Sequence, residues 1–248
     1  MNNFKKMYLT GLKSERDSIV GHLVIITAFY LILLLLSRRW EASMISSISF
    51  VPLSLMVIWY LFHSFDILHR EWKENTVSLF LSIPMKIECL LLSKMLALLT
   101  TYLILTMAIA AGMALIIGVN FGSLVAFIDG FLLGLSVIAN SLTLLVPLTP
   151  AAFLIYISGV SFTKGASIVR ALLGLILFSL VYMGGRIASL FFGTGAIPLN
   201  FTEIISNGSQ SLTIAMGSIP LALFFTACLV GMMSFFLSVR LLEERPRP

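Results

Sequence analysis

The sequence predicts an all-α membrane protein with six transmembrane helices, and three observations support this fold class. The chain has 248 residues, of which 59% are hydrophobic. Only 11% are charged, against about 25% in a typical soluble domain, so a soluble fold of this size could not cover its core with polar surface. The apolar residues also gather into segments long enough to cross a bilayer, which takes about 20 residues. These features exclude a soluble enzyme, a nucleic-acid-binding module and a disordered chain.

The six segments define the expected transmembrane helices. They are Ile19–Ser37, Met44–Phe62, Met95–Gly118, Leu124–Phe162, Val169–Phe192 and Met216–Val239. The fourth is nearly twice the required length and contains Pro147 and Pro150, so it forms either one kinked or re-entrant segment or two spans. The positions of Lys and Arg favour six spans, because this count keeps most of them in the cytoplasm with both termini. At those span ends they would contact membrane lipid and no nucleic acid.

The first 17 residues are too polar to enter the bilayer. Apolar side chains recur at helical spacing at Phe4, Tyr8 and Leu12, and lysines occupy the opposite face. Ser14 and Asp17 form a capping pattern directly before the first span. We therefore expect a separate amphipathic helix over residues 1–17 that lies on the inner membrane surface.

The loop over residues 65–94 is the longest polar stretch between two spans. Leu68, Trp72, Thr76 and Leu79 share one helical face, and Pro84 ends the pattern. This spacing predicts an amphipathic helix at the cytoplasmic surface that is able to contact a partner. An ordinary interfacial loop is the alternative.

With this loop, the N-terminal helix and six spans, the sequence resembles the permease subunits of ABC type-2 exporters. The residues that match the family's loop pattern E…(G)T…L…P…K are Glu71, Thr76, Leu79, Leu81, Pro84 and Lys94. Asn75 stands where the family often has glycine, and asparagine also tolerates a left-handed backbone. The likeness in layout extends over the whole chain, whereas the motif covers residues 71–94 only.

The resemblance implies ATP-driven transport in which a separate cytosolic ABC ATPase binds ATP and Mg²⁺. This chain would then bind no cofactor or metal and contain no catalytic residue, which agrees with the absence of a GxxxxGK[ST] motif from the sequence. The coupling helix that docks the ATPase would consist of Arg70, Glu71, Trp72, Glu74, Thr76, Leu79 and Pro84. Trp72 is the best candidate for an apolar anchor.

The resemblance also implies partners and a location. A second permease chain, identical or paralogous, would complete the substrate pathway in a bacterial inner membrane. The last outer loop, around residues 193–211, would contain short re-entrant helices. Substrates of the family include peptides, antibiotics, lipids and glycan carriers, and no side chain of this sequence selects among them.

Three polar residues near the inner end of the second span follow helical spacing. His63, Asp66 and His69 lie at i, i+3 and i+6, and these residue types are suitable ligands for zinc or iron. The arc from the first to the last is wide for a single ion. We therefore favour polar residues that cap the span, with a metal site as the alternative.

Two charges lie inside apolar segments, Asp129 in the fourth and Arg186 in the fifth. Each is about six residues inward from the outer end of its span, so we consider an intramembrane ion pair between them. In the alternative, each side chain reaches the outer headgroups separately. Ala126, Gly130 and Gly134 form a ladder of small residues beside Asp129, suited to helix packing within the chain or, alternatively, between two chains.

Other classes of membrane protein fit less well. An intramembrane protease would need an embedded histidine or paired glutamates, but the histidines lie near the cytoplasmic face and Glu203 is isolated. A secondary transporter would show inverted repeats or several midplane polar residues. The membrane subunit of another ATPase-linked transporter, similar to a haem exporter or a vitamin importer, stays open as the alternative.

Overall fold

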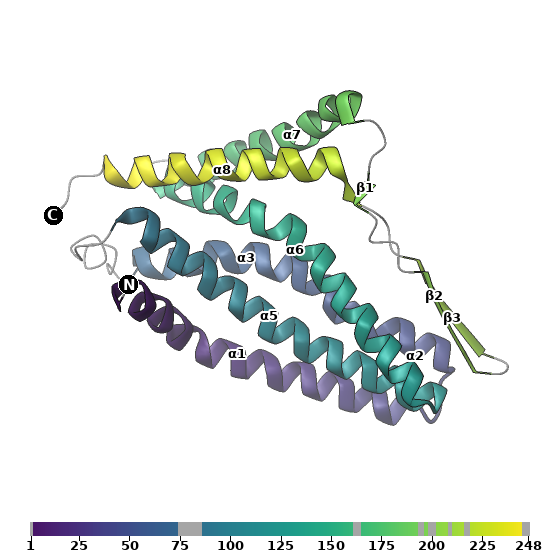
Figure 1. The fold of residues 1–248 in the computed structure, drawn as a ribbon. Helices are drawn as coiled ribbons and strands as arrows, with labels where there is room; N and C mark the ends of the chain where they lie inside the picture. The colour runs from purple at the N-terminus through teal and green to yellow at the C-terminus, as the bar shows by residue number, and fades with distance from the viewer. Residues whose placement is uncertain are drawn as a thin grey trace.

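The computed structural model describes residues 2–73, 86–160, 165–192, 196–197, 202–207, 210–215 and 219–244, and these are almost entirely helical (Figure 1). The helices are α1 (Asn2–Leu36), α2 (Ala42–Ser49), α3 (Val51–Lys73), α5 (Ile87–Phe121), α6 (Leu124–Val160), α7 (Ala166–Phe192) and α8 (Leu221–Glu243). In the described ranges, six helical segments are long and apolar enough to cross a membrane, with α2 and α3 together forming one of them. The expectation of a helical protein with six candidate spans is confirmed.

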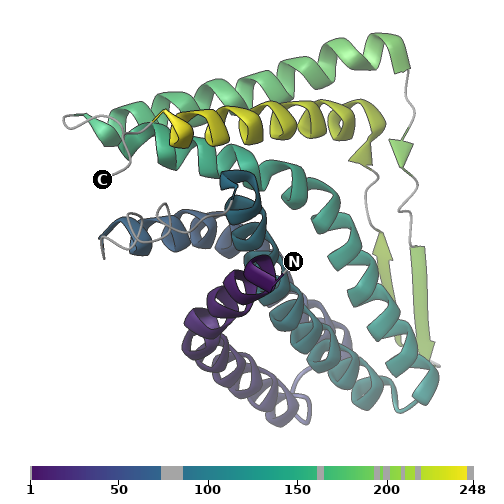
Figure 2. The same cartoon turned by 60° about the vertical axis from the view of Figure 1, so that its left-hand side comes forward.

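Helix α5 lies at the centre of the bundle and packs against α1, α2, α3 and α6. Its inward face is fully buried along most of its length, for example at Leu98, Leu105 and Ile109. Gly112 lets α1 approach closely, because a Cβ there would overlap the ring of Tyr30. Helices α7 and α8 form a separate pair that lies along one half of α6 (Figures 1 and 2).

Helix α6 runs without a break through Pro147 and Pro150, and it is visibly bent (Figure 2). Its first half, expected to lie toward the outside, packs on α5, where Gly134 lies against Ala110. Its second half, expected to lie toward the cytoplasm, packs on α8, where Gly231 lies against the carbonyl of Pro147. The small residues expected to pack helices together are thus used within the chain, and the proline-containing region separates two halves with different partners.

Two expectations for helical elements were wrong. Residues 2–17 form no separate interfacial helix, because α1 is continuous from Asn2 to Leu36. Nothing in this stretch breaks a helix, and Ser14 bonds to the carbonyl of Gly11 within it rather than capping a new start. The second wrong expectation was that short re-entrant helices lie between α7 and α8.

That outer segment contains β-strands in its described parts rather than re-entrant helices. Strand β1 (Ala196–Ile197) pairs with β4 (Ile219–Pro220), and β2 (Thr202–Asn207) pairs with β3 (Gln210–Ala215), both antiparallel. The β2–β3 register runs from Thr202 opposite Ala215 to Asn207 opposite Gln210.

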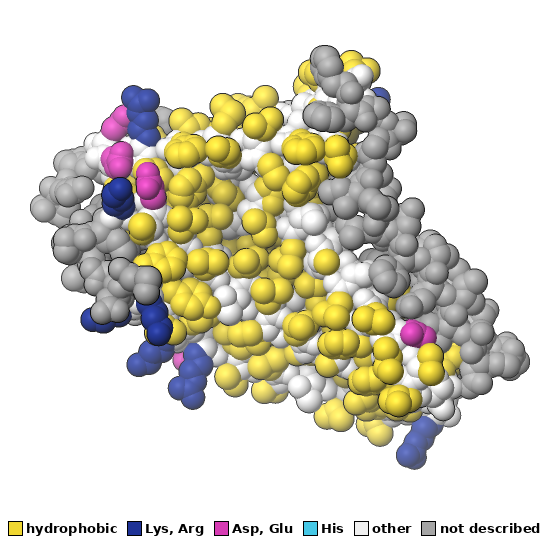
Figure 3. All heavy atoms as spheres, viewed as in Figure 1, with side chains coloured by type: hydrophobic (Ala, Val, Ile, Leu, Met, Phe, Trp, Pro, Cys, Tyr) yellow, Lys and Arg dark blue, Asp and Glu magenta, His cyan; other side chains and the backbone are white. Residues whose placement is uncertain are grey.

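The distribution of side chains agrees with a membrane-embedded molecule. On the face shown in Figure 3, apolar side chains cover the middle and charged ones gather toward the ends. The start of α1 and the end of α8 lie at the same end of the molecule (Figure 1), as an even number of crossings requires. The segment 74–85, which joins α3 to α5, is attached at this end too.

Candidate functional site

The candidate site lies at the end of the molecule where α3 stops and α5 begins. Of the predicted ATPase-docking residues, Arg70, Glu71 and Trp72 form the last turn of α3. The others fall outside the described residues; they are Glu74, Thr76, Leu79 and Pro84. The structure therefore leaves the expected coupling helix untested but describes the elements to which it is attached.

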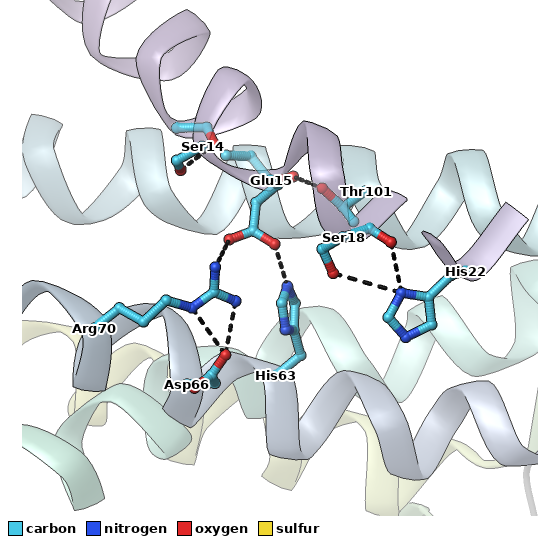
Figure 4. Close-up of polar contacts among 10 residues, drawn as sticks. Ser14, Glu15, Ser18, His22, His63, Asp66, Arg70 and Thr101 are labelled. Atoms are coloured by element: carbon cyan, nitrogen blue, oxygen red, sulfur yellow. Dashed lines mark hydrogen bonds and ion pairs between the residues drawn. The ribbon is translucent and has the colours of Figure 1, made fainter. Parts of the chain in front are cut away.

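A buried carboxylate joins α1 to α3 at this end (Figure 4). Glu15 is only 3% exposed. One of its oxygens lies 2.6 Å from Nε2 of His63, and the other lies 3.4 Å from a guanidinium nitrogen of Arg70. Arg70 also donates two hydrogen bonds to Asp66, at 2.7 and 2.9 Å. We call Glu15, His63, Asp66 and Arg70 the Glu15 cluster.

Aromatic packing orients His63 within the Glu15 cluster. Its ring stacks on Trp59 with ring centroids 4.4 Å apart and planes inclined by 19°. Trp59 in turn meets the edge of His22, whose Nδ1 lies 2.7 Å from the carbonyl of Ser18. The cluster and these rings thus join the middle of α1, at residues 15–22, to α3 through both charge and ring contacts.

A second group of side chains joins α3, α6 and α7. Tyr156 of α6 is 3% exposed. Its hydroxyl lies 3.2 Å from Nδ1 of His69, its ring meets Trp72 edge-on at 5.6 Å, and the guanidinium of Arg170 lies 4.5 Å from the ring centroid. Gly159 makes room for Arg170, because a Cβ there would overlap its side chain. We call Tyr156, His69, Trp72 and Arg170 the Tyr156 junction.

An apolar core surrounds the Tyr156 junction and brings in two more helices. Its buried members come from α3, α5, α6 and α8 and are Leu68, Ile87, Leu91, Phe153, Ile157, Val239 and Leu242. Because Leu68 lies just before segment 74–85 and Ile87 just after it, both attachment points of this segment belong to one packed core. Five helices therefore meet at this place.

The junction changes the interpretation of Trp72. This side chain is half-buried and packs on Tyr156 within its own chain. Truncating it would therefore disturb the fold as well as any docking surface. A test of docking is better made with other residues of the segment.

His63, Asp66 and His69 each contact a different residue, respectively Glu15, Arg70 and Tyr156. Within the described ranges, no group of three or more His, Cys, Asp and Glu side chains is placed to hold a metal ion. The three residues therefore act as separate contacts between helices in this structure.

Asp129 and Arg186 are not brought together. Asp129 lies in the outer half of α6, which packs on α5, whereas Arg186 lies in α7 near Gly184 and Gly185, which pack on α8. The start of α6 and the end of α7 lie well apart in both ribbon views (Figures 1 and 2). The predicted ion pair within one chain is thus not formed, because the bend of α6 directs its outer half away from α7.

Two apolar cavities flank α6 at its prolines. The larger, about 630 Å³, lies between α5, α6 and α8 and is lined by Met95, Pro147, Pro150, Phe224 and Phe235 among others. The smaller, about 210 Å³, lies on the opposite side between α3, α6, α7 and α8 and includes Phe65 and Phe178. Both surfaces suit apolar groups only.

Sequence reasoning missed Glu15 and Tyr156. A signal for Glu15 was present, because it continues the helical face of Tyr8 and Leu12 that was recognised as apolar. A carboxylate on such a face requires a buried partner. Tyr156 had no comparable signal, since a tyrosine in an apolar helix is ordinary.

Comparisons with family models, curated proteins and solved structures gave no match. The function must therefore be inferred from the residues and their geometry.

Proposed function

We propose that this chain is the membrane-spanning permease subunit of an ABC type-2 exporter in a bacterial inner membrane. It binds no ATP itself; a separate ABC ATPase docks on segment 71–85 from the cytoplasm and supplies the energy. Two permease chains, identical or paralogous, enclose the substrate pathway. Both termini lie in the cytoplasm.

The Tyr156 junction is the observation that carries this proposal. A coupling element has to transmit movement of a docked partner to the transmembrane helices. Segment 74–85 is attached to α3 and α5, whose ends share a buried core with α6 and α8, and Tyr156 extends the contact to α7 through Arg170. Because packed interiors transmit displacement rather than absorb it, movement of the segment would reach all five helices.

Helix α6 is suited to convert that movement into a change of the pathway. Tyr156 lies about two turns beyond Pro150 and moves with the inner half of the helix. A proline removes a backbone hydrogen bond and allows a helix to bend. The two cavities beside the prolines would open or close with this bend, and their apolar walls favour a hydrophobic or amphipathic substrate.

The test reverses charges in the docking segment and leaves Trp72 in place. The tagged protein is purified in mild detergent from membranes of its native cell, and co-purified P-loop ATPases are identified by mass spectrometry and assayed for ATP hydrolysis. Glu71→Lys with Glu74→Lys should lose the ATPase that the unchanged chain retains. Like charges placed across an interface repel and reduce both association rate and affinity.

The matched control is Glu243→Lys with Glu244→Lys, two exposed acidic residues at the end of α8. This variant carries the same change in net charge and should retain the ATPase. If the unchanged chain brings down no P-loop ATPase, the proposed function is wrong. Full retention of ATPase and ATP hydrolysis by the Glu71 and Glu74 variant would exclude the segment as the docking element.

A further inference from the structure

Two opposite charges lie on outward-facing apolar surfaces of the molecule. Asp129 is half-buried on α6, and Arg186 is exposed on α7. In the described part of the chain, neither side chain has an ion pair or a hydrogen-bond partner. Each lies about one and a half turns inside the outer end of its helix.

The surroundings of both charges are apolar and largely exposed. On α6, Val125, Ile128 and Leu132 beside Asp129 are exposed, whereas Ala126 and Leu133 on its other side are buried. On α7, the neighbours of Arg186 are exposed too, namely Tyr182, Met183 and Leu190. Each charge is therefore set into a stripe that faces lipid or another protein.

Of the two charges, Asp129 is the one that requires a partner of opposite charge. An arginine can extend its long stem to the headgroups, but the short side chain of Asp129 has no such reach. The phosphates of the lipid headgroups carry the same sign as its carboxylate and do not stabilise it. Ionisable groups within transmembrane helices usually pair or face a polar cavity, so Asp129 needs a cation from elsewhere.

That cation cannot be Arg186 of the same chain in this structure. The outer half of α6 is held on α5 by Gly130 and Gly134, and the outer part of α7 is held on α8 by Gly184 and Gly185. In a second copy of the chain, Arg186 is exposed on α7 and can approach Asp129 of the first copy from outside.

We propose that two copies of this chain associate through these faces, with Asp129 of each copy paired to Arg186 of the partner subunit. A two-fold axis along the membrane normal makes such a contact self-complementary and forms two ion pairs. The apolar residues around each charge pack against each other and exclude lipid. This inference extends the proposed function by naming the surface through which two permease chains meet, but its test involves neither ATP nor an ATPase.

The experiment uses two full-length copies with different tags, co-expressed and solubilised in mild detergent. Affinity purification through one tag should recover the other tag with the unchanged chain. Two Asp129→Arg copies, or two Arg186→Asp copies, should lose most of this recovery because like charges meet. An Asp129→Arg copy mixed with an Arg186→Asp copy should regain it, since the mixed dimer contains an opposite-charge pair at both contacts.

The mixture distinguishes pairing between chains from pairing within one. Within either single variant the two charges have the same sign, so only contact between copies can restore attraction. Rescue by the double swap in one chain without rescue by the mixture would overturn the proposal in favour of an intrachain pair. Unchanged recovery with both single variants would overturn it in favour of separate solvation by headgroups.

A control variant and a measurement of accumulation complete the experiment. Arg39→Asp, an exposed charge reversal outside the helices, should leave recovery unchanged. If a single variant fails to accumulate alone, its accumulation when co-expressed with the opposite variant supports the pairing, and continued failure of the mixture contradicts it.

Discussion

Glu15 shows how one side chain can bind a terminal segment to the bundle. Its carboxylate is shielded from water and contacts two potential cations on α3. Removal of one partner from a buried ionic contact is costly because the other stays desolvated. Without Glu15, His63 and Arg70 would lose their link to α1, and the N-terminal part of α1 would be held by apolar packing and by the hydrogen bond between Tyr8 and Thr100.

We expect Glu15→Gln to lower the free energy of unfolding by about 2–3 kcal/mol, less than in a fully buried pair because Arg70 is 39% exposed. For a chain of this size, this corresponds to a melting temperature that is roughly 4–12 °C lower. Thermal unfolding in detergent, followed by tryptophan fluorescence, measures the change.

The matched control for Glu15 is Asp66→Asn. Asp66 contacts the same Arg70, but its side chain is 49% exposed, so its loss should cost no more than about 1 kcal/mol. Equal effects of the two substitutions would show that burial of Glu15 does not determine the strength of the contact.

At the scale of the element, α6 combines a bend with two different packing surfaces. Its prolines lie between the half that packs on α5 and the half that packs on α8. At the inner contact, Gly231 lets α8 approach the carbonyl of Pro147 closely. The bend is therefore supported from outside the helix as well as by the prolines.

Gly231→Ala should push α8 away from α6. The new Cβ would overlap backbone rather than a flexible side chain, so we expect a loss of about 1–3 kcal/mol in stability, as for other overpacked sites. Gly174→Ala on α7 is the control, since its nearest atom would be 3.6 Å away. The control should be neutral or more stable by up to about 1 kcal/mol, because alanine favours helix.

Thermal unfolding of both glycine variants gives the comparison directly. A Gly231 variant as stable as the unchanged chain would mean that α6 and α8 adjust their spacing freely. The bend of α6 would then not depend on this contact.

At the scale of the whole molecule, the positions of the helix ends predict which connecting segments share one side of the membrane. The start of α1, the end of α8 and the attachment points of segment 74–85 lie together, opposite the turn between α1 and α2 (Figure 1). In the proposed orientation the cytoplasm is on the side rich in Lys and Arg, so we expect residue 39 to face outward and residue 167 to face the cytoplasm.

Cysteines introduced at Arg39 and Ser167 test this orientation, both positions being exposed. The background lacks Cys89 and Cys228, the two native cysteines. An impermeant maleimide applied to intact cells should label position 39, and position 167 should react only after permeabilisation. Labelling of 167 alone from outside would reverse the orientation, and labelling of both would mean that α6 does not cross the membrane once.

The helical character and the six candidate spans could be predicted because hydropathy and helix length are local properties of the chain. A run such as Val169–Phe192 is apolar whatever surrounds it. The continuity of α1 past Ser14 was missed because a capping pattern is permissive: Ser14 bonds within a helix as readily as it starts one. The strands between α7 and α8 were missed because the expectation for this loop came from the family resemblance and not from its own residues.

What the sequence alone determined is therefore where the apolar helices lie and where charge interrupts them. Which charges meet was decided by the tertiary structure, since that depends on the direction of each helix and the helices against which it packs. Glu15 reaches His63 and Arg70 across 48 and 55 residues because α1 and α3 both pack on α5. Asp129 and Arg186 stay apart within the chain because the bend of α6 sends one of them toward α5, while the other follows α8. Hydropathy contains no information about that bend, which arises from the two prolines and the contacts on either side of them.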